Sequence, residues 1–195
     1  MSLSVARSEL ILGGQKSGKT RRAEALAAAW LAASPGHRAL LIATAEAHDE
    51  EMRQRIARHQ SDRAARVPRM GTLEESRDLA GALAQHGAPD TLIVVDCLTL
   101  WLTQWAMPSA ENFDEKEAPA HDWSAQAALF FEALEKTPGP VVLVGNEIGL
   151  GVIPMGREVR AFVDALGLLN QQAAQACKRV TLMAAGLPLS LKDVS

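Results

Sequence analysis

Short apolar stretches alternate with longer segments of helical spacing along most of the 195-residue chain. Continuous apolar stretches are typical of strands buried on both faces, as in a parallel sheet. Strands are expected at 9–12, 39–44, 91–98, 140–146 and 179–186, with a short edge strand at 189–192. Helices are expected at 21–33, 49–60, 72–87 and 124–136, and over most of 155–178. The alternation predicts one α/β domain over residues 1–195, with a mainly parallel sheet and helices on both faces.

Two of the expected helices carry end signals. The segment 49–60 has acidic residues first and basic residues last, which suits the helix dipole. Thr72 is followed three residues later by Glu75, the spacing of a capping box, so a helix is expected to begin at Thr72.

Residues Gly13 to Thr20 form a glycine-rich loop between the first expected strand and the first expected helix. The loop matches the pattern GxxxxGK[ST] in the context that this pattern requires. Its glycines allow backbone N–H groups to turn toward phosphate oxygens, and the helix adds its positive dipole end. Lys19 is expected to neutralise the β- and γ-phosphates, and the Thr20 hydroxyl to bind Mg²⁺.

Asp96 follows the apolar residues LIVV in the strand expected at 91–98. Parallel sheets gather their ligands at the carboxyl ends of the strands, and packing alone explains an aspartate there poorly. Asp96 is therefore expected to join Thr20 in the shell of the magnesium ion.

Composition narrows the classes of function. The chain is 48% hydrophobic and 22% charged with a net charge of −3, an ordinary globular balance that gives no electrostatic reason to expect nucleic acid. Its apolar runs are shorter than the ~20 residues of a membrane helix, and its N-terminus lacks a signal peptide's apolar core. Cys97 and Cys177 are expected to be reduced thiols in a cytoplasmic protein. The sequence has no Asn-Lys-x-Asp guanine reader of regulatory GTPases and no obvious lid of nucleoside monophosphate kinases.

His59 lies near the end of the helix expected at 49–60. Met52, Ile56 and His59 share one helix face, which is expected to lie against the protein body. Neighbouring arginines would attract phosphate and lower the pKa of the imidazole, whereas the helix C-terminus would raise it. These residues leave two interpretations open: a nucleophile that attacks phosphorus, or an ordinary histidine at a helix end.

Five segments cover most of the chain in a fixed order: LGGQKSGKTRRAE, IATAEAHDEEMRQRIARHQSDR, VVDCLTLWLT, VVLVGNEIGLGVIP and REVRAFVDALGLLNQQAAQACKRVTLMAAGLPLSLK. Together they resemble the bifunctional adenosylcobinamide kinase/adenosylcobinamide-phosphate guanylyltransferase family of cobalamin biosynthesis. The resemblance implies a P-loop NTPase-like domain with one short antiparallel edge strand, assembled as a homotrimer. It also implies that His59 is the histidine that carries GMP.

The resemblance implies two reactions on one corrinoid substrate. ATP or GTP phosphorylates the aminopropanol hydroxyl of adenosylcobinamide, and the preferred donor is left open. GTP then donates GMP through a guanylyl-histidine to that phosphate, which gives adenosyl-GDP-cobinamide and pyrophosphate. Mg²⁺ is the expected cofactor, and no nucleic acid or membrane partner is implied.

The resemblance assigns site residues by their position in the family pattern. His59 and Lys19 are catalytic, and Thr20 and Asp96 bind the metal. The nucleotide-binding residues are Gly13, Gly14, Gln15, Lys16, Ser17, Gly18, Lys19, Thr20, Thr44, Ala45, Glu46, Ser61, Asp62, Arg63, Ala64, Glu74 and Asp96. Asn146 and Glu147 belong to a family segment at another strand end. Trp101, Trp105 and the acidic segment 107–124 are candidates for corrin contact by position only, and Trp101 is more typical of a core residue.

The chain departs from the family pattern at several positions, among them Gln104, where Asn is usual. Gln15-Lys16 stands where Ala-Arg is usual, and Gln60 where Arg is frequent, followed by a segment that lacks the usual Pro and Trp. A single-function kinase of another small alcohol, with His59 structural, remains an alternative. A non-catalytic nucleotide-binding module is a third, although Asp96 and His59 together argue against it.

Overall fold

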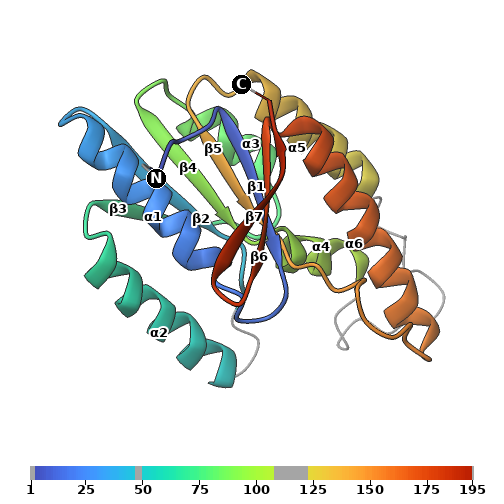
Figure 1. The fold of residues 1–195 in the computed structure, drawn as a ribbon. Coiled ribbons are helices and arrows are strands. Elements are labelled where there is room, and N and C mark those ends of the chain that lie inside the picture. The colour runs from blue at the N-terminus through green and yellow to red at the C-terminus, as the bar shows by residue number, and fades with distance from the viewer. Residues whose placement is uncertain (1–2, 47–49, 108–122, 195) are drawn as a thin grey trace.

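A sheet of seven strands, in the order β3-β2-β4-β5-β1-β6-β7, runs through the computed structural model, which describes residues 3–46, 50–107 and 123–194 (Figure 1). The strands are β1 (Ser8–Gly13), β2 (Arg38–Ala43), β3 (Met70–Glu74), β4 (Thr91–Asp96), β5 (Val141–Val144), β6 (Arg179–Ala184) and β7 (Leu187–Asp193). Neighbours pair in parallel except β6 and β7, which are antiparallel. The predicted mainly parallel sheet and its antiparallel edge strand are confirmed.

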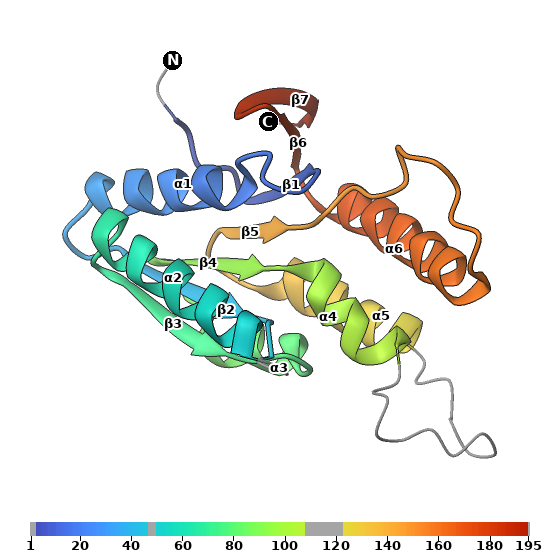
Figure 2. The same cartoon turned by 90° about the horizontal axis from the view of Figure 1, so that it is seen from below.

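Helices cover both faces of this sheet. They are α1 (Lys19–Ala33), α2 (Glu50–Arg66), α3 (Leu79–His86), α4 (Leu98–Ala106), α5 (Trp123–Lys136) and α6 (Arg157–Ala176). Figure 2 shows α1 on one side of the sheet and α4 and α5 on the other. In Figure 1, α2 lies beside α1 rather than on the sheet.

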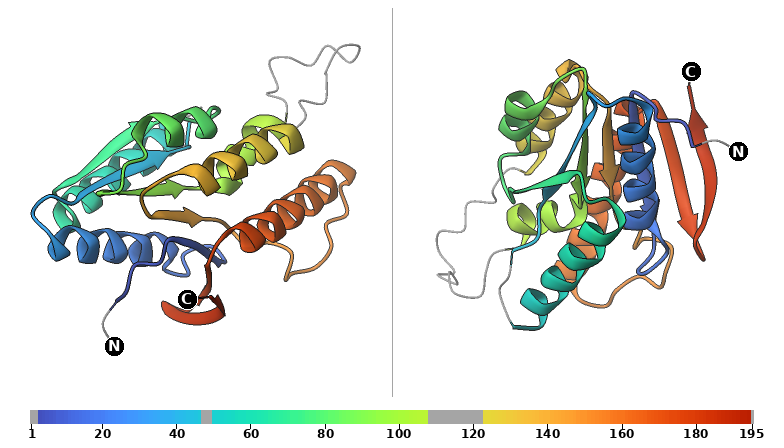
Figure 3. Two further views of the ribbon diagram at one scale, coloured as in Figure 1. Left: turned by 90° about the horizontal axis from the view of Figure 1, so that it is seen from above. Right: turned by 90° about the vertical axis from the view of Figure 1, so that its left-hand side faces the viewer.

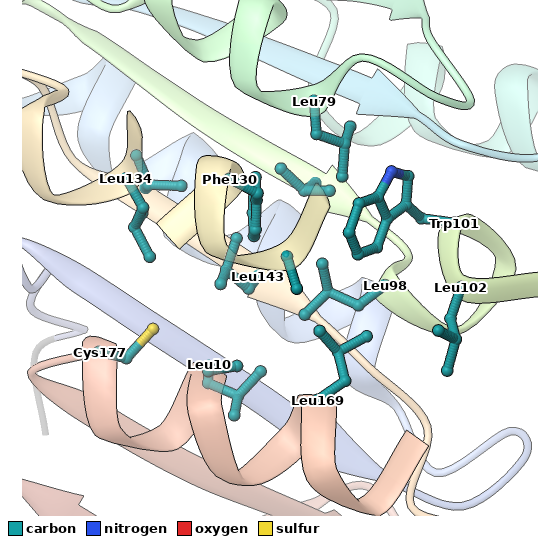
Figure 4. Packing of buried hydrophobic residues seen from close by; sticks show 14 of the residues in the cluster. Leu10, Leu79, Leu98, Trp101, Leu102, Phe130, Leu134, Leu143, Leu169 and Cys177 are labelled. Atoms are coloured by element: carbon teal, nitrogen blue, oxygen red, sulfur yellow. The ribbon is translucent and has the colours of Figure 1, made fainter. Parts of the chain in front are cut away.

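Two apolar cores hold these layers together. Under α1, the side chains of Leu26 and Ala27 pack on Ile11 and its neighbours in the sheet. On the other face, Trp101 and Phe130 lie at the centre of a larger cluster (Figure 4). Each fully buried side chain of this size contributes about 1.5–3 kcal/mol through burial. Trp101 is 1% exposed, which confirms its expected place in the core. Its indole N–H donates to the Arg77 carbonyl at 2.9 Å.

The prediction of a helix at 72–87 is wrong for the first part of that segment. Residues Met70–Glu74 form strand β3, which pairs with β2, and α3 begins only at Leu79. The Thr72–Glu75 spacing is not a capping box here, because Glu75 accepts hydrogen bonds from the backbone of residues 77 and 78. Asp78 caps α3 instead, accepting from Gly81 N at 2.8 Å.

Other element ends differ from the expected ones. Strand β4 ends at Asp96 rather than at residue 98, and Leu98–Ala106 form α4, which the sequence pattern did not predict. Helix α2 continues beyond Gln60 to Arg66. The longer helix also contains Arg63 and Arg66, so these arginines lie on the same helix as His59.

Both cysteines are buried free thiols. Burial is the main cause that raises the pKa of Cys97 to about 11 and that of Cys177 to about 12. Both side chains therefore stay protonated near neutral pH, which disfavours reactions that need a thiolate.

The acidic segment expected at 107–124 lies mostly outside the described residues, because 108–122 are not among them. Within the described ranges, no helix combines the length and the apolar character needed to cross a membrane.

Candidate functional site

The glycine-rich loop connects β1 to α1 in a backbone conformation that requires glycine. Gly13 has a φ of 153°, and a Cβ there would lie 2.5 Å from the Met183 carbonyl oxygen. Gly18, with a φ of 103°, stands directly before α1, where a Cβ would lie 3.3 Å from Gly186 Cα. The loop therefore lies against the end of β6 and the turn that follows it. A Cβ would clash at Gly13, and the positive φ of Gly18 disfavours a side chain there.

Lys19 is held inside this loop. Its side chain is buried, and Nζ donates to the Gly14 carbonyl at 2.7 Å. Burial lowers the pKa of Lys19, an effect that Cys97 and Asp96 partly oppose. Bound phosphate would offer this ammonium group a compensating negative charge in place of a single carbonyl oxygen.

Thr20 and Asp96 meet at the mouth of the loop. The Thr20 hydroxyl, in the first turn of α1, donates to Asp96 Oδ2 at 3.1 Å, at the end of β4. Magnesium in phosphate-transfer sites is held by one or two carboxylates together with phosphate oxygens and water. These two side chains offer oxygen atoms only, so they fit Mg²⁺. Buried Ser17 Oγ, in the same loop, has no hydrogen-bond partner among the described residues.

The segment after β5 lies beside the loop because β5 pairs with both β1 and β4. Glu147 N donates to the Gly13 carbonyl at 3.1 Å. Asn146 N donates to Thr99 Oγ1 at 2.9 Å, and the Asn170 side chain donates to the Asn146 carbonyl at 3.1 Å. The structure thus brings Asn146 and Glu147 next to the phosphate loop.

Thr44 is fully buried, with its hydroxyl engaged by the protein backbone. Thr44 Oγ1 donates to the Cys97 carbonyl and accepts from Cys97 N, both at 2.8 Å. This contact fixes the chain directly after Asp96. A contact of Thr44 with nucleotide stays a prediction.

Two pockets lie between α2 and the edge of the sheet. One, of about 360 Å³, is lined by residues that include Ala45, Glu46 and Glu74. The other, of about 330 Å³, is lined by residues that include Arg63, Ala64 and Glu74. Gln60 Nε2 donates to Glu74 Oε1 at 3.4 Å and lines both pockets. Five residues assigned by family position, far apart in sequence, are therefore gathered in one region.

Some of the other residues assigned to the site by family position are exposed, and the side chain of one is not among those described. Gln15, Lys16, Ser61 and Asp62 are exposed. His59 belongs to α2 by its backbone, but its side chain is outside the described residues. The same holds for Met52 and Ile56, so the expected shared face of these three side chains stays a prediction.

Glu24 is a residue that sequence reasoning missed. It is buried in α1, and its Oε2 accepts from Arg66 Nη1 of α2 at 2.6 Å. Burial raises the pKa of Glu24, and the attraction of Arg66 and Arg63 opposes that rise. The available signal was helical spacing, because Glu24 occupies the same stripe of α1 as the buried residues Ala27 and Leu31.

Comparison with known proteins gives a consistent result. The family model described as cobinamide kinase / cobinamide phosphate guanyltransferase matches residues 9–191. The bifunctional adenosylcobalamin biosynthesis protein CobP of Pseudomonas aeruginosa is 44% identical over 186 residues, covering 94% of this chain and 96% of that protein. The bifunctional adenosylcobalamin biosynthesis protein CobU of Salmonella typhimurium is 33% identical over 187 residues, covering 94% and 98%. The CobU of Escherichia coli is 32% identical over 187 residues, with the same coverage.

Among solved structures, the flagellar accessory protein FlaH of Methanocaldococcus jannaschii is similar in fold. The match has a TM-score of 0.50 and 11% sequence identity, and it covers 97% of this chain and 80% of FlaH. At this identity the likeness concerns the fold alone, which agrees with the α/β architecture predicted from the sequence.

Proposed function

The chain belongs to the cobinamide kinase / cobinamide phosphate guanyltransferase family, and we propose that its phosphate loop holds the triphosphate donor for both of the family's reactions. The protein phosphorylates adenosylcobinamide and then transfers GMP from GTP to the product. The observation that supports one shared site is the meeting of Lys19, Thr20 and Asp96 at the loop, with α2 attached to the same helix α1.

In the first reaction, the loop's N–H groups and Lys19 hold the triphosphate with its γ-phosphorus open to the acceptor. The aminopropanol oxygen forms a bond to the γ-phosphorus, and the bond from that phosphorus to the β–γ bridging oxygen breaks. The nucleoside diphosphate leaves with the bonding electrons, and the hydroxyl proton passes to solvent. Thr20 and Asp96 would hold Mg²⁺, which neutralises charge on the phosphates.

In the second reaction, His59 is the proposed nucleophile. Its neutral imidazole forms a bond to the α-phosphorus of GTP, and pyrophosphate leaves. An oxygen of adenosylcobinamide phosphate then attacks the same phosphorus, and the imidazole leaves with the bonding electrons. The pockets beside α2 are the proposed nucleoside sites, because Glu74, which family position assigns to the nucleotide, lines both and Glu46 lines the first. ATP and GTP both remain candidate phosphoryl donors, and a cytoplasmic location stays a prediction.

Labelled GTP tests this proposal. With Mg²⁺ and no corrinoid, label from [α-³²P]GTP is expected to become bound to the protein through an acid-labile bond, whereas label from [γ-³²P]GTP is not. With adenosylcobinamide, γ-label is expected in the corrinoid. Phosphorylation of the corrinoid without α-label on the protein would favour a single-function kinase. Nucleotide binding with no transfer at all would favour a non-catalytic module.

We also propose that the chain assembles as a homotrimer through its C-terminal edge. Figure 3 shows β7 at the outer edge of the sheet. Its side chains Leu187, Leu189 and Leu191 are 70%, 57% and 56% exposed. An exposed edge strand with apolar side chains favours contact with another chain.

Light scattering coupled to gel filtration checks the assembly. The wild type is expected to have about three times the mass of the 20.9 kDa chain. Leu189→Glu with Leu191→Glu is expected to lower the mass toward that of one chain, because charged side chains at an apolar contact are unfavourable. The control is Leu129→Glu, an exposed position on α5, which should keep the wild-type mass. A monomeric wild type would contradict the proposal.

A further inference from the structure

Helix α2 is attached to the rest of the protein through its C-terminal part. The described side chains at Ala57, Arg58 and Gln60 are exposed, whereas Arg63 is buried. Val67, directly after the helix, is also buried, in the core under α1. Figure 1 shows the helix extending from this end beyond the edge of the sheet. Contacts near residues 63–67 therefore determine the direction in which α2 points.

Besides the longer Gln60–Glu74 hydrogen bond of 3.4 Å, two shorter polar contacts attach α2 to its neighbours. Arg66 Nη1 donates to Glu24 Oε2 at 2.6 Å, and Arg63 Nη2 donates to Thr72 Oγ1 at 2.9 Å. The first connects α2 to α1, and the second connects it to β3. A buried carboxylate holds its guanidinium partner in a fixed position, because separating the two would leave an unpaired buried charge, which is costly.

Glu24 lies one helical turn after Thr20, so α1 carries both the metal-binding hydroxyl and the partner of Arg66. On α2, residues 59, 63 and 66 are spaced as neighbours along one helix face. Seven residues of helix span about 10 Å, so a tilt of about 10° at Arg66 displaces the backbone of His59 by roughly 2 Å. Misplacement of a reacting group by about 1 Å can cost about 10²-fold in rate.

We propose that Glu24 is a positioning residue that, through Arg66, sets the distance between His59 and the triphosphate held by the phosphate loop. This inference rests on the proposed function. Phosphoryl transfer from the γ-phosphate uses groups on the loop itself and does not need His59. Loss of the Glu24–Arg66 contact therefore slows guanylylation of the protein selectively.

The test compares the two reactions in Glu24→Gln and Arg66→Met. Single-turnover labelling with [α-³²P]GTP gives the rate of guanylylation, and turnover with adenosylcobinamide gives the rate of phosphoryl transfer. Guanylylation is expected to slow by about 10–100-fold in either variant, with little change in the GTP concentration for half-maximal rate. Phosphoryl transfer is expected to stay within about twofold of wild type.

A double-mutant cycle identifies the pair. Glu24→Gln combined with Arg66→Met is expected to be no slower than the slower single variant, since both remove the Glu24–Arg66 contact. Arg66→Met also removes the Arg66–Asp62 pair of 3.2 Å, which is exposed and therefore contributes little. The matched control is Asp90→Asn, which breaks the exposed Arg38–Asp90 pair of 2.9 Å at the start of β2, at the strand ends away from the phosphate loop, and should leave both reactions unchanged. Glu24→Gln alone decides the question should Arg66→Met not fold, because the neutral amide leaves no buried charge without its partner.

Distinct outcomes overturn distinct statements. Equal loss of both reactions, or unchanged guanylylation, in variants that unfold in urea like wild type would overturn the positioning role of Glu24 and leave the proposed function intact. Absence of α-label on wild-type protein would overturn the proposed guanylyl-histidine, and the positioning role with it.

Discussion

Replacing Lys19 with alanine is expected to lower kcat/KM for phosphoryl transfer and the rate of guanylylation together, each by about 10²–10³-fold. The physical reason is that one buried ammonium group, now bonded to the Gly14 carbonyl, would neutralise the same phosphates in both reactions. Steady-state kinetics with adenosylcobinamide and single-turnover labelling with [α-³²P]GTP measure the two effects.

The matched control is Lys136→Ala, since Lys136 is an exposed lysine on α5 paired only with Glu132 among the described residues. Both reactions should proceed at wild-type rates in that variant. Near-normal guanylylation in Lys19→Ala would mean that the two reactions hold their triphosphates in different places, and the shared donor site would be wrong.

Replacing His59 with alanine is expected to slow only one of the two reactions, whereas Lys19→Ala slows both. Guanylylation should fall by about 10⁴-fold or more, because a nucleophile that forms a covalent intermediate has no substitute. Phosphoryl transfer to adenosylcobinamide should stay within about threefold, since the imidazole takes no part in it. Acid-labile labelling of the protein from [α-³²P]GTP measures guanylylation, and turnover of adenosylcobinamide measures phosphoryl transfer.

His86→Ala is the control, because His86 lies in the last turn of α3 on the far face of the sheet. It should label like wild type. Undiminished label in His59→Ala would show that another residue carries GMP. Equal loss of both reactions in that variant would show that His59 supports the fold of the site rather than its chemistry.

The glycine-rich loop and the aspartate beside it could be predicted because their signals are local. Gly13, Gly18 and Lys19 lie within one loop, and the rule for parallel strand ends places Asp96 beside it without knowledge of the contacts. The structure confirms this geometry, with Thr20 and Asp96 in contact across 76 residues of sequence. Their roles in binding stay predictions that the variants above test.

Strand β3 could not be predicted, because its formation depends on a partner. Thr72 and Glu75 have the spacing of a helix cap, and only pairing with β2 makes the segment extended. The β-sheet context therefore overrides the local pattern. Glu24 was missed for a related reason: its partner Arg66 lies 42 residues further along the chain.

Gln60, one of the positions that depart from the family pattern, makes a hydrogen bond in the structure. Gln60, where the family often has Arg, donates to Glu74 at 3.4 Å between the two pockets. An amide keeps a hydrogen bond to that carboxylate without the charge. Binding at the proposed nucleoside site is therefore expected to depend less on salt concentration than in relatives with Arg at this position.

The contact between the phosphate loop and the β6–β7 turn has a consequence for the order in which the site is built during synthesis. The proposed phosphate-binding segment leaves the ribosome early, yet β1 pairs with β5 and β6, which come far later. The Ser17 carbonyl accepts from Gly186 N at 3.0 Å, almost at the end of the chain. The glycine-rich loop is thus synthesised long before the strands that fix its conformation. Premature termination within the last strands would remove residues that pack against the proposed nucleotide site.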